Sequence, residues 1–252
     1  MSNGNPLAVQ LYTFRATPLP ERPALLEALA AAGYGAVEPF GDPAAAGPLR
    51  AELDQAGLRV CSLHANVDRD GLEPVIEAAK TLGTDTIVVP LLQRDGWGDA
   101  DTVRGLAEQV NEWGRQAASQ GLRVGYHNHW FEMADLDGRP ALEVFAAELE
   151  PEILLEVDTY WAAVGGQDVP ALLRRLGDRV RLLHLKDGPA DSRESPMTAV
   201  GTGVMPVAEI LAAAPAAEWN IVELDDCASD VLTAVRDSAT WLRDHGLATA
   251  VR

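Results

Sequence analysis

The sequence predicts a single (β/α)8 barrel, an α/β fold in which eight parallel strands alternate with eight helices. The main observation is a repeated unit: an alanine-rich helical stretch ends at a glycine, and a short apolar run begins two or three residues later. The glycines are Gly33, Gly57, Gly83 and Gly121, each where the end of a helix requires a positive φ angle. The runs show little polar alternation, which is typical of parallel strands buried on both faces.

The strands and helices can be placed in order along the chain. Strands are expected at about residues 7–12, 35–40, 58–64, 85–91, 122–128, 153–158, 180–186 and 219–224. Helical stretches are expected near residues 21–32, 44–56, 71–82, 99–120, 140–149, 168–176, 205–213 and 229–245. The residues from Asp99 illustrate one helix start, because acidic side chains in the first turn suit the positive end of the helix dipole.

An open, doubly wound sheet is the alternative fold. It is less favoured because no G-x-G-x-x-G motif follows the first strand, where the turn reads Tyr12-Thr13-Phe14-Arg15. No linker rich in proline, glycine or serine divides the chain, and its 252 residues suit one barrel of about 200–250 residues. We therefore expect one domain that spans residues 1–252.

Composition excludes several classes of protein. The chain has 38 acidic and 20 basic Lys and Arg residues, so its formal charge is −18, which repels phosphate backbones and argues against a nucleic-acid partner. No apolar run approaches the ~18 residues of a membrane span, and the first residues do not resemble a secretory signal. With only Cys61 and Cys227, we expect no disulfide framework and a cytoplasmic location. A monomer and a small homo-oligomer both remain open.

Polar side chains gather where the expected strands end, and a barrel places its site on the loops at those ends. Four of the five histidines lie there, together with several carboxylates. The residues at these ends are Glu38, His64, His127, His129, Glu156, Asp158, His184, Lys186 and Glu223. Imidazoles and carboxylates that converge on one mouth can hold one divalent ion, with Mn, Mg, Co and Zn as candidates.

The period of two along a strand sharpens this expectation. Glu156 and Asp158 face the same way, with Val157 toward the helices, and His184 and Lys186 share a face in the same manner. The inward members are the polar ones. A charged group that points into a barrel is costly unless it is paired or bound to a metal.

At this level of detail the chain resembles the xylose isomerase-like TIM barrels, a superfamily of sugar phosphate isomerases and epimerases that includes D-tagatose 3-epimerase-like enzymes, inosose dehydratase and endonuclease IV. The resemblance covers essentially the whole chain. It is carried by Val9-Gln-Leu-Tyr-Thr13, Gly125-Tyr-His-Asn-His-Trp-Phe-Glu132, Glu156-Val-Asp-Thr-Tyr-Trp161, His184-Leu-Lys-Asp187, Gly201-Thr-Gly203 and Val222-Glu223.

The resemblance implies one divalent ion held by residues from strands five to eight. By match of position, Asp158, His184 and Glu223 are three of its ligands. Many relatives carry Glu-Asn-His on the fifth strand, whereas this chain carries His127-Asn128-His129. The fourth ligand is therefore either His127 or Glu132, and the chain is most similar to the subgroup with Tyr-His-Asn-His.

The expected activity is a metal-dependent isomerase or epimerase acting on a small polyhydroxylated carbonyl compound, a sugar, sugar phosphate or inositol-derived molecule. The ion would chelate the carbonyl and a neighbouring hydroxyl, so that a base forms an enediolate. The expected catalytic residues are Glu223, Lys186, His129 and Glu132. The expected substrate contacts are Glu38, His64, Trp130, Glu156 and Trp161.

Three other functions can be weighed against the pattern of residues. A lyase or dehydratase of the inosose or keto-sugar type is the main alternative, since loss of a β-hydroxyl can follow the same proton removal. Endonuclease IV-like repair conflicts with the acidic charge. A metal-free sugar-binding barrel conflicts with the retained ligand residues. The Gly201-Thr-Gly203 segment could also hold a phosphate through its backbone N–H groups, although no Lys or Arg lies beside it.

Overall fold

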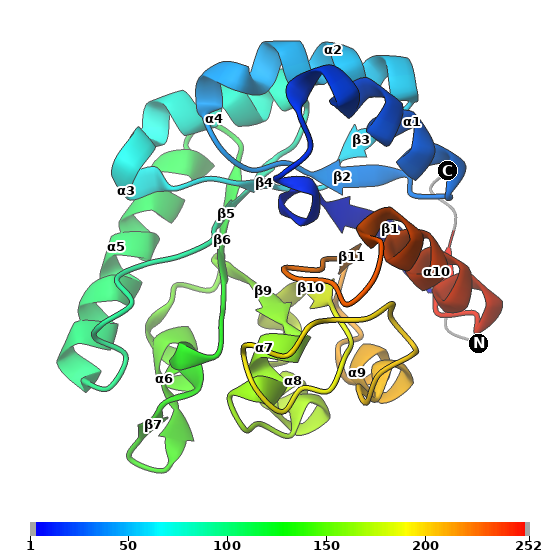
Figure 1. The fold of residues 1–252 in the computed structure, drawn as a ribbon. Helices are drawn as coiled ribbons and strands as arrows, with labels where there is room; N and C mark the ends of the chain where they lie inside the picture. The colour runs from blue at the N-terminus through cyan, green and yellow to red at the C-terminus, as the bar shows by residue number, and fades with distance from the viewer. Residues whose placement is uncertain (1–3, 250–252) are drawn as a thin grey trace.

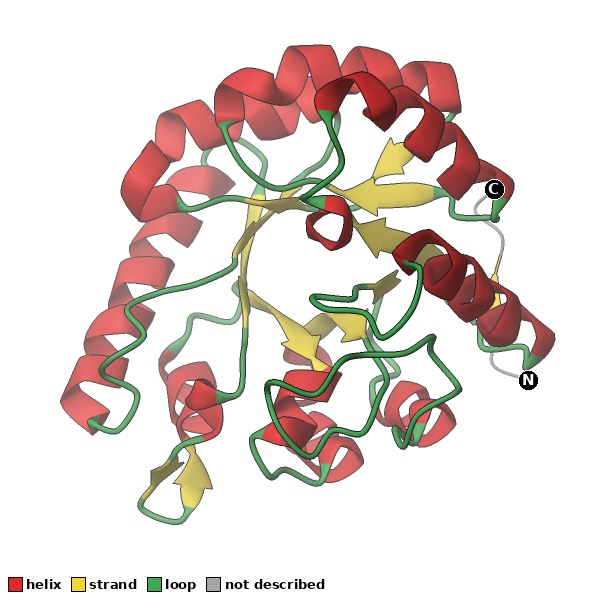
Figure 2. Cartoon of the chain, in the orientation of Figure 1, coloured by secondary structure: helices red, strands yellow, loops and turns green. Residues whose placement is uncertain are grey.

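The computed structural model describes residues 4–249 and confirms the α/β barrel (Figures 1 and 2). The parallel sheet runs in the order β3-β2-β1-β11-β10-β9-β6-β5-β4, and β12 pairs with β1. The strands are β1 (Asn5–Gln10), β2 (Ala36–Glu38), β3 (Arg59–Val60), β4 (Leu63–His64), β5 (Thr86–Val89), β6 (Arg123–His127), β9 (Leu154–Asp158), β10 (Val180–Leu185), β11 (Trp219–Val222) and β12 (Ala248–Thr249). A separate antiparallel hairpin consists of β7 (Asp135–Leu136) and β8 (Arg139–Pro140).

The third expected strand is interrupted at Cys61 and Ser62, and this interruption joins the two edges of the sheet. Its first half, β3, pairs with β2, and its second half, β4, pairs with β5. A bridge between Phe40 and His64 and a hydrogen bond from the Cys61 N–H to the Val37 carbonyl (3.1 Å) continue the pairing across the junction. The ring of strands is therefore nearly closed.

Helices surround the ring of strands on the outside, as Figure 1 shows. They are α1 (Arg22–Ala31), α2 (Ala46–Ala56), α3 (Val67–Asp70), α4 (Leu72–Leu82), α5 (Ala100–Ala118), α6 (Ala141–Glu148), α7 (Thr159–Val164), α8 (Val169–Leu176), α9 (Val207–Ala213) and α10 (Val231–Asp244). Short 3-10 turns lie at Leu11–Phe14, Leu19–Glu21, Pro43–Ala45, Phe131–Met133 and Gly177–Arg179. All eight expected helices are present, and the sequence did not predict α3, α7 or the hairpin. The four glycines expected at helix ends all have positive φ angles, between 69° and 92°.

The strands separate two apolar layers, as a period of two requires. Outward residues such as Val157 and Leu183 belong to the large core beneath the helices. A small core fills the barrel itself, made of Ala8, Ala36, Cys61, Val88, Leu154, Leu182 and Ile221. This inner layer supports the polar residues that follow it along the strands.

Within residues 4–249, no helix combines the length and the apolar character needed to cross a membrane.

Candidate active site

The register of the strands places the polar side chains directly above the inner apolar layer. On β9, Leu154 faces inward and Glu156 and Asp158 follow it on the same face. Asp158 lies beside His184 of β10 in the pairing. These three polar residues are fully buried. The expected inward orientation of the polar strand residues therefore agrees with the structure.

Local structure fixes the orientation of Asp158. It is the N-cap of α7, and its Oδ1 accepts a hydrogen bond from the Trp161 N–H (2.8 Å). The Asn128 side chain holds its backbone, accepting from the Asp158 N–H (3.1 Å) and donating to the Asp158 carbonyl (3.3 Å). Because Oδ1 is used in this way, Oδ2 is left for the site. It is buried, and the ammonium of Lys186 lies 2.8 Å from it.

Four side chains around this oxygen form what we call the outer ligand group: His127, Asp158, His184 and Glu223. Each offers one ligand atom, and the four atoms lie within 4.8 Å of one another. His184 Nδ1 is 2.8 Å from Glu223 Oε2, and His127 Nε2 is 3.9 Å from Asp158 Oδ2. Two buried imidazoles and two buried carboxylates fit a divalent ion of the Zn or Mn type.

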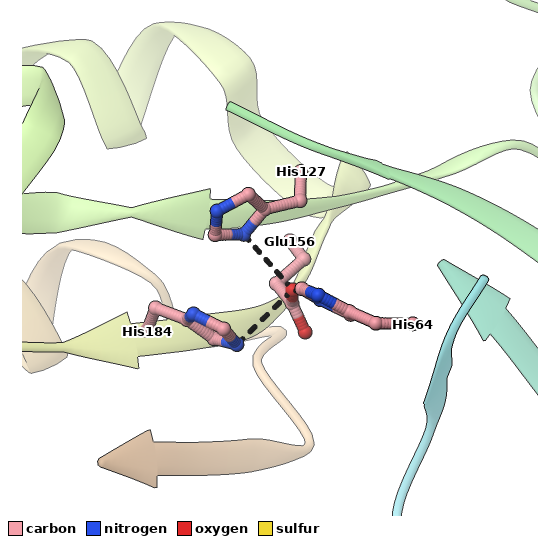
Figure 3. A group of neighbouring side chains, drawn as sticks. All are labelled: His64, His127, Glu156 and His184. Carbon is pink, nitrogen blue, oxygen red and sulfur yellow. Dashed lines mark hydrogen bonds and ion pairs between the residues drawn. The ribbon is translucent and has the colours of Figure 1, made fainter. Parts of the chain in front are cut away.

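Beneath this group, one carboxylate oxygen meets three imidazoles (Figure 3). Glu156 Oε2 lies 2.5 Å from His64 Nε2, 3.0 Å from His127 Nδ1 and 3.1 Å from His184 Nε2. Glu38 Oε2 lies 2.7 Å from the same nitrogen of His184. His127 and His184 thus direct one nitrogen to the outer ligand group and the other to a buried carboxylate. This arrangement fixes the tautomer and orientation of metal-binding histidines in proteins.

His64, His127, Glu156 and His184 could themselves hold an ion, since their ligand atoms also lie within 4.8 Å of one another. The geometry favours the outer group, because Glu156 Oε2 already occupies the point on which the three imidazoles converge. We therefore assign the inner residues to the support of the outer group.

Burial and charge shift several pKa values at this site. Burial raises the pKa of Glu38, and the adjacent Glu156 carboxylate raises it further. Burial holds the pKa of His127 well below its ordinary value, which keeps this imidazole neutral and able to bind a cation. Burial also lowers the pKa of His184, but the carboxylates of Glu156, Glu223 and Glu38 outweigh it and raise that pKa well above its ordinary value.

Lys186 provides a fixed positive charge beside the outer ligand group. Its Nζ is 2.8 Å from Asp158 Oδ2 and 2.7 Å from Glu223 Oε2, and it also contacts the Asp225 carboxylate. Burial lowers the pKa of Lys186, but these carboxylates outweigh it and hold the pKa well above its ordinary value. The 2.8 Å contact with Asp158 is an ion pair and makes Lys186 the neighbour of Oδ2.

Glu132 lies outside both groups. Its Oε1 accepts a hydrogen bond from the Tyr126 hydroxyl (2.7 Å), and its Oε2 accepts from the His129 N–H (2.8 Å). It is fully buried and does not line the cavity above the site. Of the two candidates for a fourth ligand, this placement favours His127, and it changes the expected role of Glu132 from catalysis to support of the loop after β6.

Glu38 and Glu156 also differ from their expected role. Both lie beneath the cavity wall, where imidazole nitrogens and the side chains of Gln10 and Ser62 contact their oxygens. Neither residue lines the cavity, and Glu156 Oε1 is buried without a hydrogen bond within residues 4–249.

A cavity of about 630 Å³ is lined by two members of the outer ligand group, His127 and Glu223. The expected substrate contacts His64, Trp130 and Trp161 line it, together with His129 and Lys186. The Trp130 and Trp161 rings lie 5.1 Å apart and form an aromatic wall. The volume is within the range of small-molecule sites in proteins, about 300–1,000 Å³.

The Gly201-Thr-Gly203 segment has a structural partner. The buried Asp187 carboxylate accepts hydrogen bonds from the N–H groups of Gly188 (2.9 Å), Gly201 (2.8 Å) and Met205 (3.0 Å). The amide of Gly201 is thus already bound, so this loop does not provide the phosphate cradle that its sequence suggested.

Three residues that contact the site were not expected from the sequence: Asp225, Gln10 and Ser62. Asp225 follows Glu223 by two residues, so a period of two continued past the eighth strand could have indicated it. Gln10 ends β1 and donates to Glu38 (2.7 Å), which a period of two along β1 could also have indicated. Ser62 lies in the interruption of the third strand, where no strand pattern applies.

Known proteins share this fold and part of this sequence. A 2-epi-5-epi-valiolone 7-phosphate 2-epimerase from Actinoplanes sp. is 27% identical over 178 residues, which are 64% of this chain and 62% of the epimerase. The match thus spans less than two thirds of that relative. The crystal structure of a sugar phosphate isomerase/epimerase from Parabacteroides distasonis has a TM-score of 0.82 and 25% identity, with 100% of this chain and 96% of that chain covered.

A third similarity concerns the fold alone. The crystal structure of the IOLI protein with a bound zinc atom has a TM-score of 0.75 and 15% identity, and covers 98% of this chain and 99% of that one. The names of the Actinoplanes and Parabacteroides relatives are those of isomerases or epimerases, the class expected from the sequence. The sequence profile of the xylose isomerase-like TIM barrel matches residues 26–245, and the chain belongs to that family.

Proposed function

We propose that this chain is a divalent-metal-dependent isomerase or epimerase that acts on a small polyhydroxylated carbonyl compound, a sugar or sugar phosphate. One observation carries the proposal: the ligand atoms of the outer ligand group lie within 4.8 Å of one another, and two of its members, His127 and Glu223, line a cavity that Lys186 also lines. The names of the epimerase and isomerase relatives support the same class.

In this proposal His127, Asp158, His184 and Glu223 hold the ion. A bound divalent ion would polarise a substrate carbonyl and acidify the neighbouring C–H. Glu223 supplies the base: burial raises its pKa, but Lys186 and His184 outweigh this effect and keep the pKa well below its ordinary value, so the group is ionised at neutral pH. Removal of a proton leaves an enediolate of the substrate. Return of a proton to the other carbon isomerises it, and return to the other face epimerises it.

Lys186 and the aromatic wall position the reacting groups. The ammonium of Lys186 stays protonated and lies 2.7 Å from Glu223 Oε2, so it orients the proposed base. Trp161 packs against the same ammonium, with Nζ 5.3 Å from the ring centre. Rings at the mouth exclude water from the floor of the site, where electrostatic interactions are then stronger.

The test is solvent exchange at carbon. The protein is loaded with Mn²⁺ and incubated in D2O with ketoses, inososes and 3-keto-glycosides, and NMR reports deuterium on the carbons beside the carbonyl. We expect incorporation with at least one compound and its loss in Glu223→Gln. The matched control is Glu194→Gln, which removes a carboxylate at the cavity mouth outside the ligand group. Incorporation that persists in Glu223→Gln, or occurs with none of the compounds, would contradict the proposal.

One observation favours a second candidate, a lyase. The His129 ring lines the cavity outside the outer ligand group; its Nδ1 is buried, 3.7 Å from Glu132 Oε1, which leaves Nε2 as the ring nitrogen for the cavity. Elimination of a β-hydroxyl needs such an additional acid. The same NMR experiment separates the two reactions, because a lyase yields a product that has lost water, whereas an isomerase or epimerase yields an isomer.

A further inference from the structure

Four arginines lie around the mouth of the cavity, although the chain as a whole is strongly acidic. They are Arg15, Arg69, Arg94 and Arg193. Three of them already have acceptors. Arg15 donates to two backbone carbonyls, Arg69 pairs through two nitrogens with the Asp70 carboxylate (2.8 Å each), and Arg193 contacts the Glu194 carboxylate. Arg94 makes no hydrogen bond or ion pair with any residue between 4 and 249.

Aromatic rings hold the guanidinium of Arg94 in place. Its Cζ lies 5.0 Å from the centre of the Trp130 ring and 5.6 Å from that of Phe131. These rings are themselves packed, since Trp130 contacts Trp161 and Phe131 stacks on His129 at 5.4 Å. A guanidinium over an aromatic face keeps the N–H groups at its edge free for a planar acceptor. Arg94 is thus positioned by apolar contacts and still has its donors available.

A chain of aromatic contacts connects Arg94 to the end of the cavity where the reaction is proposed to occur. The aromatic wall runs from Arg94 over Trp130 and Trp161 to Lys186, in contacts of 5.0, 5.1 and 5.3 Å. A ligand along this wall would have one end at the outer ligand group and the other at Arg94. The Gly201 amide is not available for an anion, because Asp187 binds it.

We propose that Arg94 binds an anionic group, a phosphate or a carboxylate, at the end of the substrate away from the reacting carbon. This inference rests on the proposed function for the direction of the substrate, but the subsite itself follows from the contacts of Arg94. In a chain of charge −18, an arginine that reaches the cavity without an acidic partner attracts an anion that the rest of the surface repels.

The test compares three ligands that share one ring and differ only at C6: D-glucose, D-glucuronate and D-glucose 6-phosphate. Binding is measured by calorimetry and by quenching of tryptophan fluorescence, for the wild type, Arg94→Met and Arg69→Met. Arg69→Met is the matched control, because it removes the same charge from the same cavity but Arg69 is already paired with Asp70. We expect the wild type to bind at least one anionic ligand about 10- to 100-fold more tightly than glucose, the value of hydrogen bonds to a charged group.

Arg94→Met should remove this preference, and Arg69→Met should keep it within about twofold. The ligand that loses affinity identifies the anion as phosphate or carboxylate. A wild type without preference, a preference that survives in Arg94→Met, or equal losses in both variants would overturn the proposal. Deuterium exchange on neutral ketoses, measured in parallel on the wild type and Glu223→Gln, tests the proposed function alone, so failure of that proposal is distinguishable from failure of this one.

Discussion

Replacement of Glu156 by glutamine tests whether the buried carboxylate supports the outer ligand group. Glu156 Oε2 contacts a nitrogen of His127 at 3.0 Å and one of His184 at 3.1 Å. Glutamine has the same shape, and its amide oxygen can take the place of Oε2, so both contacts can persist. The charge is lost, and a hydrogen bond to a neutral acceptor is weaker than one to a charged acceptor by about 1 kcal/mol.

Two such bonds give a loss of about 2 kcal/mol in metal binding, or about 30-fold in affinity. This value lies within the 10- to 100-fold effect of outer-shell partners at metal sites in proteins. Burial raises the pKa of Glu156, but His184 and His64 outweigh it and hold that pKa well below its ordinary value, so the ionised carboxylate also stabilises the metal-free protein at neutral pH. Glutamine loses this contribution and relieves only the repulsion with the adjacent Glu38. The free energy of unfolding of each metal-free variant is therefore measured beside its metal affinity.

The assay is a calorimetric titration of Zn²⁺ against a competing chelator, with the Co²⁺ absorption spectrum as a second readout. Glu132→Gln is the matched control: it neutralises another fully buried carboxylate on the same side of the barrel, but one bonded to Tyr126 and the His129 backbone. It should keep the wild-type affinity for Zn²⁺. Wild-type affinity in Glu156→Gln, or an equal loss in Glu132→Gln, would refute the supporting role of Glu156.

Three further outcomes are expected. His127→Gln should lower Zn²⁺ affinity by more than Glu156→Gln does, about 100-fold or more, because it removes a ligand rather than its partner; an affinity within about tenfold of wild type by calorimetry would exclude His127 as a ligand. Gly203→Ala should destabilise the protein by about 1–3 kcal/mol in urea unfolding, since a Cβ there would lie 2.2 Å from an oxygen of the Asp187 side chain. The control Gly105→Ala lies at an open position of α5 and should stabilise the protein by about 1 kcal/mol. At the opposite end of the barrel, burial raises the pKa of Glu218, but the paired arginines outweigh it and lower that pKa below 4.5. The ionised Glu218 therefore stabilises the fold above pH 4.5, and this stabilisation is lost as the pH falls through the pKa of Glu218 in the folded protein. Glu218→Gln should therefore cost about 1 kcal/mol at pH 7, and the difference from wild type should disappear in acid; a constant difference across this range would contradict the assignment.

The positions of the strands and helices could be predicted because they depend on local rules. A glycine with positive φ ends a helix wherever it stands, and an apolar run buried on both faces needs no information about its neighbours. The interruption at Cys61 and Ser62 could not be predicted, because it depends on the junction of the two sheet edges and on a hydrogen bond from Ser62 to Glu38.

For the site, the sequence predicted which side chains point inward but not their depth. A period of two places Glu156, Asp158 and His184 on the inner face, and the structure agrees. The same period cannot tell that Glu156 lies under the histidines while Asp158 lies beside them, because depth depends on the stagger between β9 and β10. Glu132 lies in a loop without any period, so its pairing with Tyr126 had no counterpart in the sequence pattern.

The charges of the site explain why these residues occur together. Four buried carboxylates, those of Glu38, Glu156, Asp158 and Glu223, share the top of the barrel with one ammonium. The protein reduces the excess of negative charge in two ways: burial and the neighbouring carboxylate raise the pKa of Glu38, and the carboxylates raise the pKa of His184 against the effect of burial. Both shifts retain protons that a divalent ion would make unnecessary. The proposed ion would thus replace bound protons rather than add to a neutral site, so its affinity must fall as the pH falls.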